Sequence, residues 1–237
     1  MNENILIIGG NGLIGREIYK FLSKSNRVYV LDKKKINAND IVCDISNVSQ
    51  LKKYLNKFFL KKNVGIVINC SYPRLKKNTK NPLLSDPEVI LTNYKMHFLG
   101  FFNTTKYFVN YFIKKKIKGK IINFSSIYGS ILPKFEIYNK NEILTPLEYG
   151  LIKQNIVYIS KYFAKYLIGS GISINCISPG GVFDNQNKNF VTKYSKLTNS
   201  NKMMLKTDFN KIIEYLVNSK PLRITGQNFI IDDGFSL

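Results

Sequence analysis

Short runs of apolar residues alternate along the chain with segments of helix length. Most of the short runs are apolar without a period of two, which is typical of strands covered on both faces. Strands are expected at residues 5–8, 28–31, 41–43, 64–69, 120–124, 172–177 and 228–231. Helices are expected at residues 12–23, 48–60, 88–114, 146–168 and 208–218.

This alternation predicts an α/β fold in which a parallel sheet carries helices on both faces. We find no internal repeat and no linker, so residues 1–237 are expected to form a single doubly wound (Rossmann) domain. The stretches 73–87 and 184–206 are expected to be loops or short helices. Both follow strand ends, where folds of this kind bind their ligands.

The chain is strongly basic, with 36 Lys+Arg against 15 Asp+Glu and a formal net charge of +21. Almost all of this charge is lysine spread along the chain, whereas base-edge reading and planar stacking favour arginine. A specific nucleic-acid partner is therefore not expected. Two explanations of the charge remain: a solvated lysine-rich surface and an anionic small substrate. In either case the positive electrostatic field of the protein attracts phosphorylated ligands.

Scattered cysteines and the absence of a long apolar run bear on the location of the protein. Cys43, Cys70 and Cys176 form neither a disulfide framework nor a zinc pattern, so no metal is expected. No apolar run reaches the roughly 18 to 20 residues that span a bilayer. The first residues also lack the basic and apolar segments of a secretory signal. We expect a cytoplasmic protein without a membrane partner.

A glycine-rich turn joins the first expected strand to the first expected helix. Glycines at positions 9, 12 and 15 give the pattern G-x-x-G-x-x-G, through which backbone amides and the helix dipole can receive a pyrophosphate. A tight packing turn would also use glycine. However, Asp32 ends the second strand about 20 residues on, where a carboxylate can accept from the adenosine ribose hydroxyls. The turn residues expected to contact a dinucleotide are Gly9, Asn11, Gly12, Leu13, Ile14 and Gly15.

The carboxylate of Asp32 favours NAD over NADP, because it would repel a 2'-phosphate. The neighbouring Lys33 and Lys34 weaken this distinction, since an ammonium group would attract the same phosphate. The cofactor is therefore expected to be NAD, with NADP as the alternative.

The helix expected at residues 146–168 begins with clear signals. Thr145 is expected at the N-cap, Pro146 at the first helical position and Glu148 at the third. Tyr149 and Lys153 then lie four residues apart on one helix face, near its beginning.

Tyr149 and Lys153 follow a strand that ends in Ser125 and Ser126. A lysine one turn away and a nearby cationic nicotinamide would lower the tyrosine pKa from its usual value near 10. Tyr149 could then exchange a proton with a hydroxyl or carbonyl group, and Ser126 could hydrogen-bond the same oxygen. A lone Y-x-x-x-K is common on helix surfaces, but its order after the glycine turn and the serines favours catalysis.

With these motifs, the chain resembles the short-chain dehydrogenase/reductase family over nearly its whole length. The resemblance implies a seven-stranded parallel sheet, a catalytic set of Ser126, Tyr149 and Lys153, and ribose binding by Lys153. It also implies a homodimer or homotetramer that pairs through the aromatic-rich helices at 88–114 and 146–168, the family's fourth and fifth helices. The further cofactor-contacting residues implied by the resemblance are Asp44, Ile45, Asn69, Cys70, Ser71, Tyr149, Pro179, Gly180 and Val182.

Three features depart from the family pattern. The glycine spacing matches the extended, sugar-nucleotide-modifying branch. Ser126 and Tyr149 are 23 residues apart, and the extra residues at 128–144 are expected to form a loop over the active site. The family's structural asparagine should fall at position 97, where this chain has His97. Asn93 could substitute for it, and His97 itself could be a buried structural residue or a link in a proton relay.

The expected activity is NAD(P)-dependent hydride transfer between nicotinamide and a secondary alcohol or ketone. The narrower resemblance is to enzymes of bacterial surface-sugar pathways (flagellin and lipopolysaccharide sugars of the nonulosonic acid type), which implies an anionic sugar derivative as substrate. Two alternatives stay open: a sugar-nucleotide epimerase or dehydratase with tightly held NAD, and a non-catalytic dinucleotide sensor.

Overall fold

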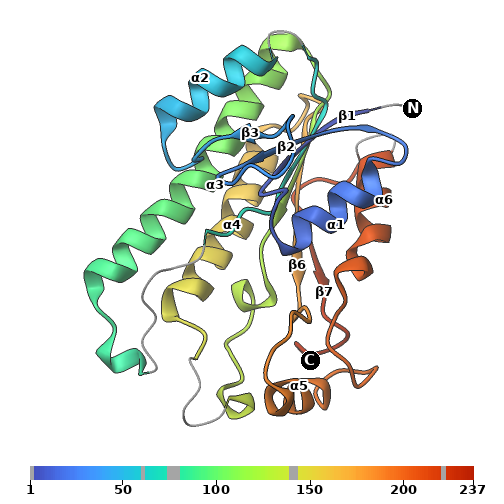
Figure 1. Ribbon diagram of the computed structural model, residues 1–237. Helices are drawn as coiled ribbons and strands as arrows, with labels where there is room; N and C mark the ends of the chain where they lie inside the picture. The colour runs from blue at the N-terminus through green and yellow to red at the C-terminus, as the bar shows by residue number, and fades with distance from the viewer. Residues whose placement is uncertain (1–2, 60–61, 74–80, 139–143, 220–222) are drawn as a thin grey trace.

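The computed structural model describes residues 3–59, 62–73, 81–138, 144–219 and 223–237. Its centre is a sheet of seven parallel strands in the order β3-β2-β1-β4-β5-β6-β7, with helices packed on both faces (Figure 1). The strands are β1 (Asn4–Ile8), β2 (Arg27–Asp32), β3 (Ile41–Val42), β4 (Ile66–Asn69), β5 (Lys120–Phe124), β6 (Ser173–Pro179) and β7 (Asn228–Ile231). The helices are α1 (Leu13–Leu22), α2 (Val48–Phe59), α3 (Pro87–Lys115), α4 (Leu147–Tyr166), α5 (Lys188–Ser195) and α6 (Asn210–Asn218). The predicted doubly wound α/β fold is confirmed.

The central strand β1 shows why these strands are apolar throughout. Its side chains alternate between two cores. Leu6 and Ile8 pack with buried residues of α2, α3 and α4. Ile5 and Ile7 pack with buried residues of α1 and α6. The two helix layers lie on opposite sides of the sheet in Figure 1. A strand covered on both faces cannot carry a polar alternation, which explains the continuous apolar runs.

The beginning of α4 differs from its prediction by one position. Pro146, not Thr145, occupies the N-cap, with φ −62° and ψ 148°, and no side chain caps the helix. The hydroxyl of Thr145 instead pairs with the hydroxyl of Tyr138. Since the fixed φ of proline suits both the N-cap and the first helical position, the sequence signal cannot separate the two. Tyr149 and Lys153 still lie one turn apart on α4.

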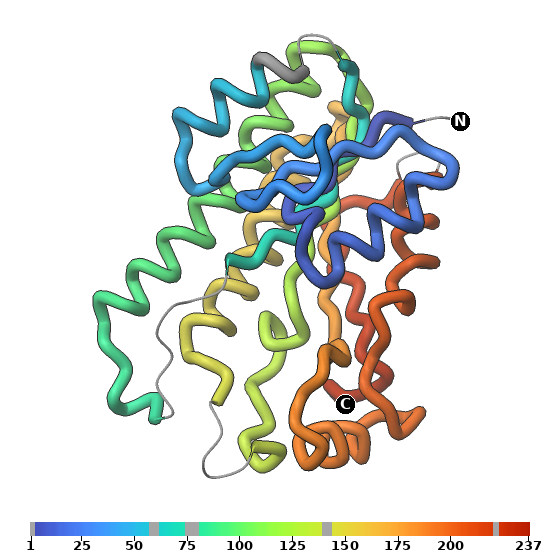
Figure 2. The backbone as a smooth tube through the Cα atoms, in the orientation of Figure 1, coloured from blue at the N-terminus to red at the C-terminus, as the bar shows by residue number. Residues whose placement is uncertain are grey.

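The stretch expected as loops or short helices at 184–206 contains the helix α5. Its buried residue Tyr194 stacks on Phe235 of the C-terminal turn, with ring centroids 4.2 Å apart. Figure 2 shows this turn beside α5. In the described part of the chain, no helix is both long and apolar enough to cross a membrane.

Candidate active site

The candidate site lies where β1, β4 and β5 end side by side. Ile8 pairs with Asn69, and Asn69 with Asn123, so the segments that follow these residues emerge at one edge of the sheet. Those segments are the glycine turn after β1, the residues Asn69 to Ser71, and the serines at 125 and 126. The topology therefore brings the three main predicted motifs together at the carboxyl edge.

The glycine turn depends on close backbone approach. Gly9 has φ +75°, and a Cβ there would lie 2.6 Å from Cα of Ser71. A Cβ on Gly15 would lie 2.2 Å from the carbonyl oxygen of Gly9. Neither position can hold a side chain without moving backbone. Gly12 is different: it is exposed and extended at the N-cap of α1.

The N-terminus of α1 fits a pyrophosphate. No side chain caps this helix, and no acidic residue lies in its first turn, which runs from Leu13 and includes Ile14 and Gly15. Its first backbone N–H groups are therefore left for an anion, which the helix dipole also favours. The donor set at this turn matches the phosphates of a dinucleotide.

Asp32 is tied to the glycine turn by backbone hydrogen bonds. Its Oδ2 accepts from the N–H of Asn11 at 3.0 Å, and its Oδ1 accepts from the N–H of Lys34 at 3.1 Å. The side chain of Asn11 donates to the Lys34 carbonyl at 2.7 Å and to Oδ2 of Asp40 at 2.9 Å. These contacts hold the carboxylate at the end of β2, beside the turn.

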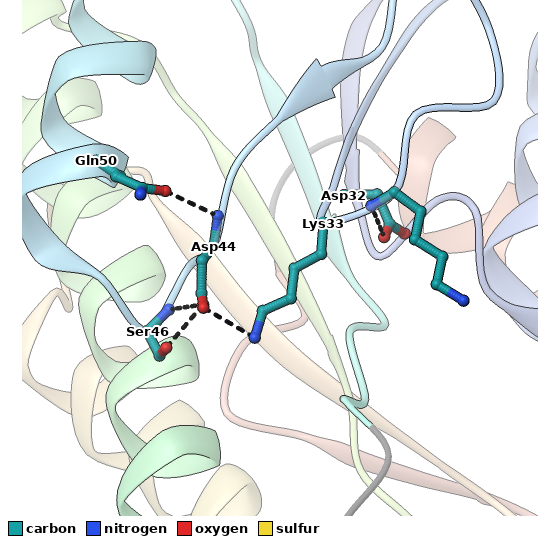
Figure 3. A network of polar contacts seen from close by, with 6 residues as sticks. Asp32, Lys33, Asp44, Ser46 and Gln50 are labelled. Atoms are coloured by element: carbon teal, nitrogen blue, oxygen red, sulfur yellow. Dashed lines mark hydrogen bonds and ion pairs between the residues drawn. The ribbon is translucent and has the colours of Figure 1, made fainter.

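Asp44 draws the Lys33 ammonium away from Asp32. Nζ of Lys33 lies 2.8 Å from Oδ2 of Asp44. Oδ1 of Asp44 accepts from the N–H and from the hydroxyl of Ser46 (Figure 3). Partial burial opposes ionisation of Asp44, but these bonds outweigh it and lower the pKa of the carboxyl. Ile45 is buried against Gly100 of α3. Its side chain therefore packs into the core, and the adenine contact that the resemblance implies stays a prediction.

The segment after β4 is held by Asn69. Its Oδ1 accepts from the N–H of Ser71 at 3.2 Å and from the Ser71 hydroxyl at 2.7 Å, while its amide donates to Thr104 at 3.0 Å. Cys70 lies with its sulfur 3.3 Å from the carbonyl of Ile8. Burial raises the pKa of the Cys70 thiol to about 12, so this thiol stays protonated and is a packing residue.

Ser126, Tyr149 and Lys153 come together as predicted. The Ser126 hydroxyl accepts from the Tyr128 N–H at 3.3 Å and hydrogen-bonds the Tyr149 side chain. Lys153 is 5% exposed, with its Nζ 5.6 Å from the Tyr149 ring centroid and 3.5 Å from the Phe124 carbonyl. The Ser125 hydroxyl donates to the Lys153 carbonyl at 2.6 Å, which fastens the strand end to the helix.

In the protein alone, the pKa of Tyr149 is raised. Burial is the largest cause, and the hydrogen bond with Ser126 offsets only part of it. Burial also lowers the pKa of Lys153 to about 8. Burial cannot be read from a four-residue spacing, and the expected lowering also requires the bound nicotinamide, so the lowered pKa stays a prediction for the protein with its cofactor. In the protein alone, the Tyr149 hydroxyl is therefore protonated at neutral pH.

Asn93 and His97, the two candidates for the place of the family's structural asparagine, lie in different surroundings on α3. The Asn93 amide donates to Oε1 of Glu148 at 3.1 Å, in a buried pair that joins α3 to the first turn of α4. His97 is 2% exposed, and neither ring nitrogen meets the distance and angle of a hydrogen bond to a described residue. Burial and the Lys153 charge lower the His97 pKa to about 4, although the Pro73 carbonyl opposes this. The imidazole is thus neutral at physiological pH.

The insert between Ser126 and Tyr149 packs at the side of the site. Two short 3₁₀ helices lie in it, η2 (Ile127–Gly129) and η3 (Phe135–Ile137), and residues 139–143 lie outside the described part. The buried Ile137 packs with Tyr194 of α5 and Phe235. Tyr128 faces the catalytic tyrosine candidate, with ring centroids 6.3 Å apart. In the described residues, Ile137 therefore anchors the insert beside α5 while Leu132 and Phe135 stay exposed, and the loop over the active site stays a prediction.

The segment after β6 completes the edge. Pro179 ends the strand, and the N–H of Gly180 donates to the Ile231 carbonyl at 2.9 Å. Val182 forms an isolated bridge with Met204.

A separate cavity of about 430 Å³ lies between α2 and α3, and none of the predicted site residues lines it.

The comparisons with known proteins agree with this geometry. The family model described as "Enoyl-(Acyl carrier protein) reductase" matches residues 23–236. Post-translational flagellin modification protein A of Campylobacter coli is 29% identical over 100% of this chain and 99% of its own length. The 3-oxoacyl-(acyl-carrier-protein) reductase FabG of Buchnera aphidicola is 25% identical over 97% of this chain and 95% of its own length.

A solved structure agrees as well. The short chain dehydrogenase of Leptospira borgpetersenii with bound NAD+ is 32% identical, has a TM-score of 0.89, and covers 100% of this chain and 94% of its own length. The match of one family model to almost the whole chain, together with a full-length structural relative, decides the family. The chain belongs to the short-chain dehydrogenase/reductase family of NAD(P)-dependent oxidoreductases.

Proposed function

We propose that this enzyme transfers hydride between NAD and a secondary alcohol or ketone of an anionic sugar derivative, with Tyr149 as general acid/base. The observation that carries the proposal is the meeting of Ser126, Tyr149 and Lys153 at the edge that also holds the glycine turn. One site thus contains the proton donor Tyr149, the Ser126 hydroxyl and the Lys153 ammonium group. The N-terminus of α1, which can bind an anion, lies at the same edge of the sheet.

The dinucleotide would be held by the glycine turn, by Asp32 and by Lys153, and when bound its nicotinamide gives or takes the hydride. In reduction, the Tyr149 hydroxyl donates its proton to the carbonyl oxygen of the substrate while the Ser126 hydroxyl hydrogen-bonds that oxygen. In oxidation, the Tyr149 phenolate takes the proton from the alcohol. The buried Lys153 ammonium stabilises the phenolate that the reductive direction leaves behind.

The sugar substrate is supported by two independent features. The full-length relative from Campylobacter coli is a flagellin modification protein, and this chain carries a net charge of +21. A positive field attracts phosphorylated ligands. The test is a screen of sugar phosphates, nucleotide sugars and acyl thioesters by the absorbance of reduced nicotinamide. We expect turnover with a phosphorylated sugar. Turnover with acyl thioesters alone would overturn the substrate assignment.

NAD is the expected cofactor, because Asp32 presents a carboxylate beside the turn and Lys33 is engaged by Asp44. We expect Asp32→Ser to weaken NAD binding by about tenfold and to reduce or reverse the preference for NAD over NADP. Titration of the variant and of the wild type with NAD and with NADP measures these affinities. Glu214→Ser, which removes a carboxylate that is 44% exposed on α6, is the control. Equal NADP affinity in the wild type would contradict the prediction.

We further propose that a second copy of the chain covers the exposed aromatic face of α4. Tyr158, Tyr162 and Tyr166 follow one another at helical spacing and are 66%, 59% and 74% exposed. Such a patch on a folded protein marks an interaction surface. A second copy of the chain suits this face, because a twofold axis brings the same face of α4 from two subunits into contact.

Tyr162→Glu is expected to convert the oligomer to monomer, because it places a charge in the centre of this face. Light scattering coupled to gel filtration measures the mass. Lys188→Gln, on α5, changes the charge by the same amount and should leave the mass unchanged. A wild-type monomer, or an unchanged oligomer in Tyr162→Glu, would refute the proposal.

A further inference from the structure

Tyr72 lies among the proposed catalytic residues although it belongs to no sequence motif. Its ring is 5.4 Å from the Tyr149 ring, at an interplanar angle of 77°. Nζ of Lys153 lies 5.0 Å from the Tyr72 centroid, closer than its 5.6 Å from the Tyr149 centroid. The buried His97 packs against Tyr72 with a centroid separation of 4.7 Å. One ring thus contacts the proton donor, the ammonium group and the imidazole.

The backbone holds Tyr72 in this place. Asn69 binds the N–H and hydroxyl of Ser71, the preceding residue, and Gly9 packs closely against Ser71. Pro73 follows, and a residue before proline is restricted to extended conformations. The backbone of Tyr72 is therefore constrained on both sides.

The Lys153 ammonium has few other compensating groups. The groups that face it are the thiols of Cys70 and Cys176, the His97 imidazole, the Tyr149 ring and the Phe124 carbonyl. Burial raises the pKa of both thiols to about 12, and the imidazole is neutral above a pH of about 4. No carboxylate of the described residues forms an ion pair with Lys153.

We propose that Tyr72 is a positioning residue whose aromatic face holds the Lys153 ammonium in its charged form and whose contact with Tyr149 fixes the phenol beside it. The inference rests on the proposed function of Tyr149 and Lys153. A ring face attracts a cation most strongly where water is excluded, which is the situation of a buried ammonium group. The ring, not its hydroxyl, carries the effect.

The test compares Tyr72→Phe, which keeps the ring, with Tyr72→Leu and Tyr72→Met, which remove it. Losing the ring removes a contact that favours the charged form, so the pKa of Lys153 should fall by about one unit from its value near 8. At about pH 9, above both values, the charged fraction of Lys153 is then about tenfold smaller, so kcat there should fall about tenfold with little change in KM, and the alkaline limb of the kcat profile should move to lower pH. Tyr72→Phe should stay within about twofold of the wild type.

The Lys153 pKa is read by NMR titration of labelled lysine, assigned with Lys153→Met. This readout needs no turnover, so it decides the inference even if no substrate is found. Tyr54→Leu, which replaces a similarly exposed tyrosine on α2, is the control for general destabilisation. An unchanged Lys153 pKa in a folded Tyr72→Leu or Tyr72→Met protein would overturn the inference. A Tyr72→Phe protein as impaired as Tyr72→Met would do the same. Equal turnover of Tyr149→Phe and wild type would instead refute the proposed function.

Discussion

Tyr149→Phe should reduce turnover by about a thousandfold while the protein still binds NAD. The substitution removes only the hydroxyl, so the ring contacts with Tyr72 and Tyr128 remain. Proton transfer by a positioned side chain contributes roughly 10²- to 10⁴-fold to a rate, and Phe supplies no proton. NAD affinity should change by less than about tenfold, the value of one hydrogen bond. Steady-state assays and cofactor titration measure the two effects separately.

The matched control for this change is Tyr215→Phe. Tyr215 lies on α6, is 54% exposed and belongs neither to the site nor to the proposed subunit interface, so loss of its hydroxyl should leave the rate within about twofold. Equal rates for Tyr149→Phe and the wild type would end the assignment of proton transfer. A loss of NAD binding equal to the loss of rate would show that the phenol acts in binding instead.

Gly15→Ala should abolish measurable dinucleotide binding and lower the stability of the fold. Its Cβ would lie 2.2 Å from the Gly9 carbonyl oxygen and 2.7 Å from Cα of Gly10, so backbone must move. Overpacking of this kind costs at least about 1 to 3 kcal/mol. We expect NAD affinity to fall by more than about a hundredfold, because the added methyl group would push the glycine turn away from the N-terminus of α1, where the pyrophosphate is expected to bind. Thermal unfolding with and without NAD measures both effects.

Two further substitutions separate folding from binding. Gly12→Ala puts a methyl group at the exposed N-cap of α1, 3.2 Å from the nearest atom, so we expect the fold to survive and NAD affinity to drop. Gly65→Ala meets its nearest atom at 3.6 Å and should change neither property. Wild-type stability and NAD binding in Gly15→Ala would show that the turn does not hold the cofactor.

The fold was predictable because its strands are buried on both faces. Ile5 to Ile8 serve two cores in alternation, which leaves a continuous apolar run as a strong signal. The glycine turn, Asp32 and the pair Tyr149 and Lys153 were predictable because local backbone geometry requires them at fixed spacings. Each of these signals is local, and the topology then carries the residues to one edge of the sheet.

The rest depends on tertiary contacts that no spacing encodes. Tyr72 and Tyr128 meet Tyr149 from two different segments, and aromatic residues elsewhere in the chain have the same local sequence character. The raised pKa of Tyr149 comes from burial, which is a property of the folded chain. The helix α5 has a single buried residue, Tyr194, so its apolar pattern predicted loops or short helices over 184–206 without fixing the bounds of the helix.

The central claim is that Tyr149 becomes acidic only beside the Lys153 ammonium and a bound nicotinamide. It is tested most directly by a tyrosinate absorbance titration of the wild type minus Tyr149→Phe, with and without saturating NAD. We expect the phenol to ionise above its ordinary pKa of about 10 in the protein alone, and about two or more pH units lower with NAD. An identical titration in both states would contradict the claim.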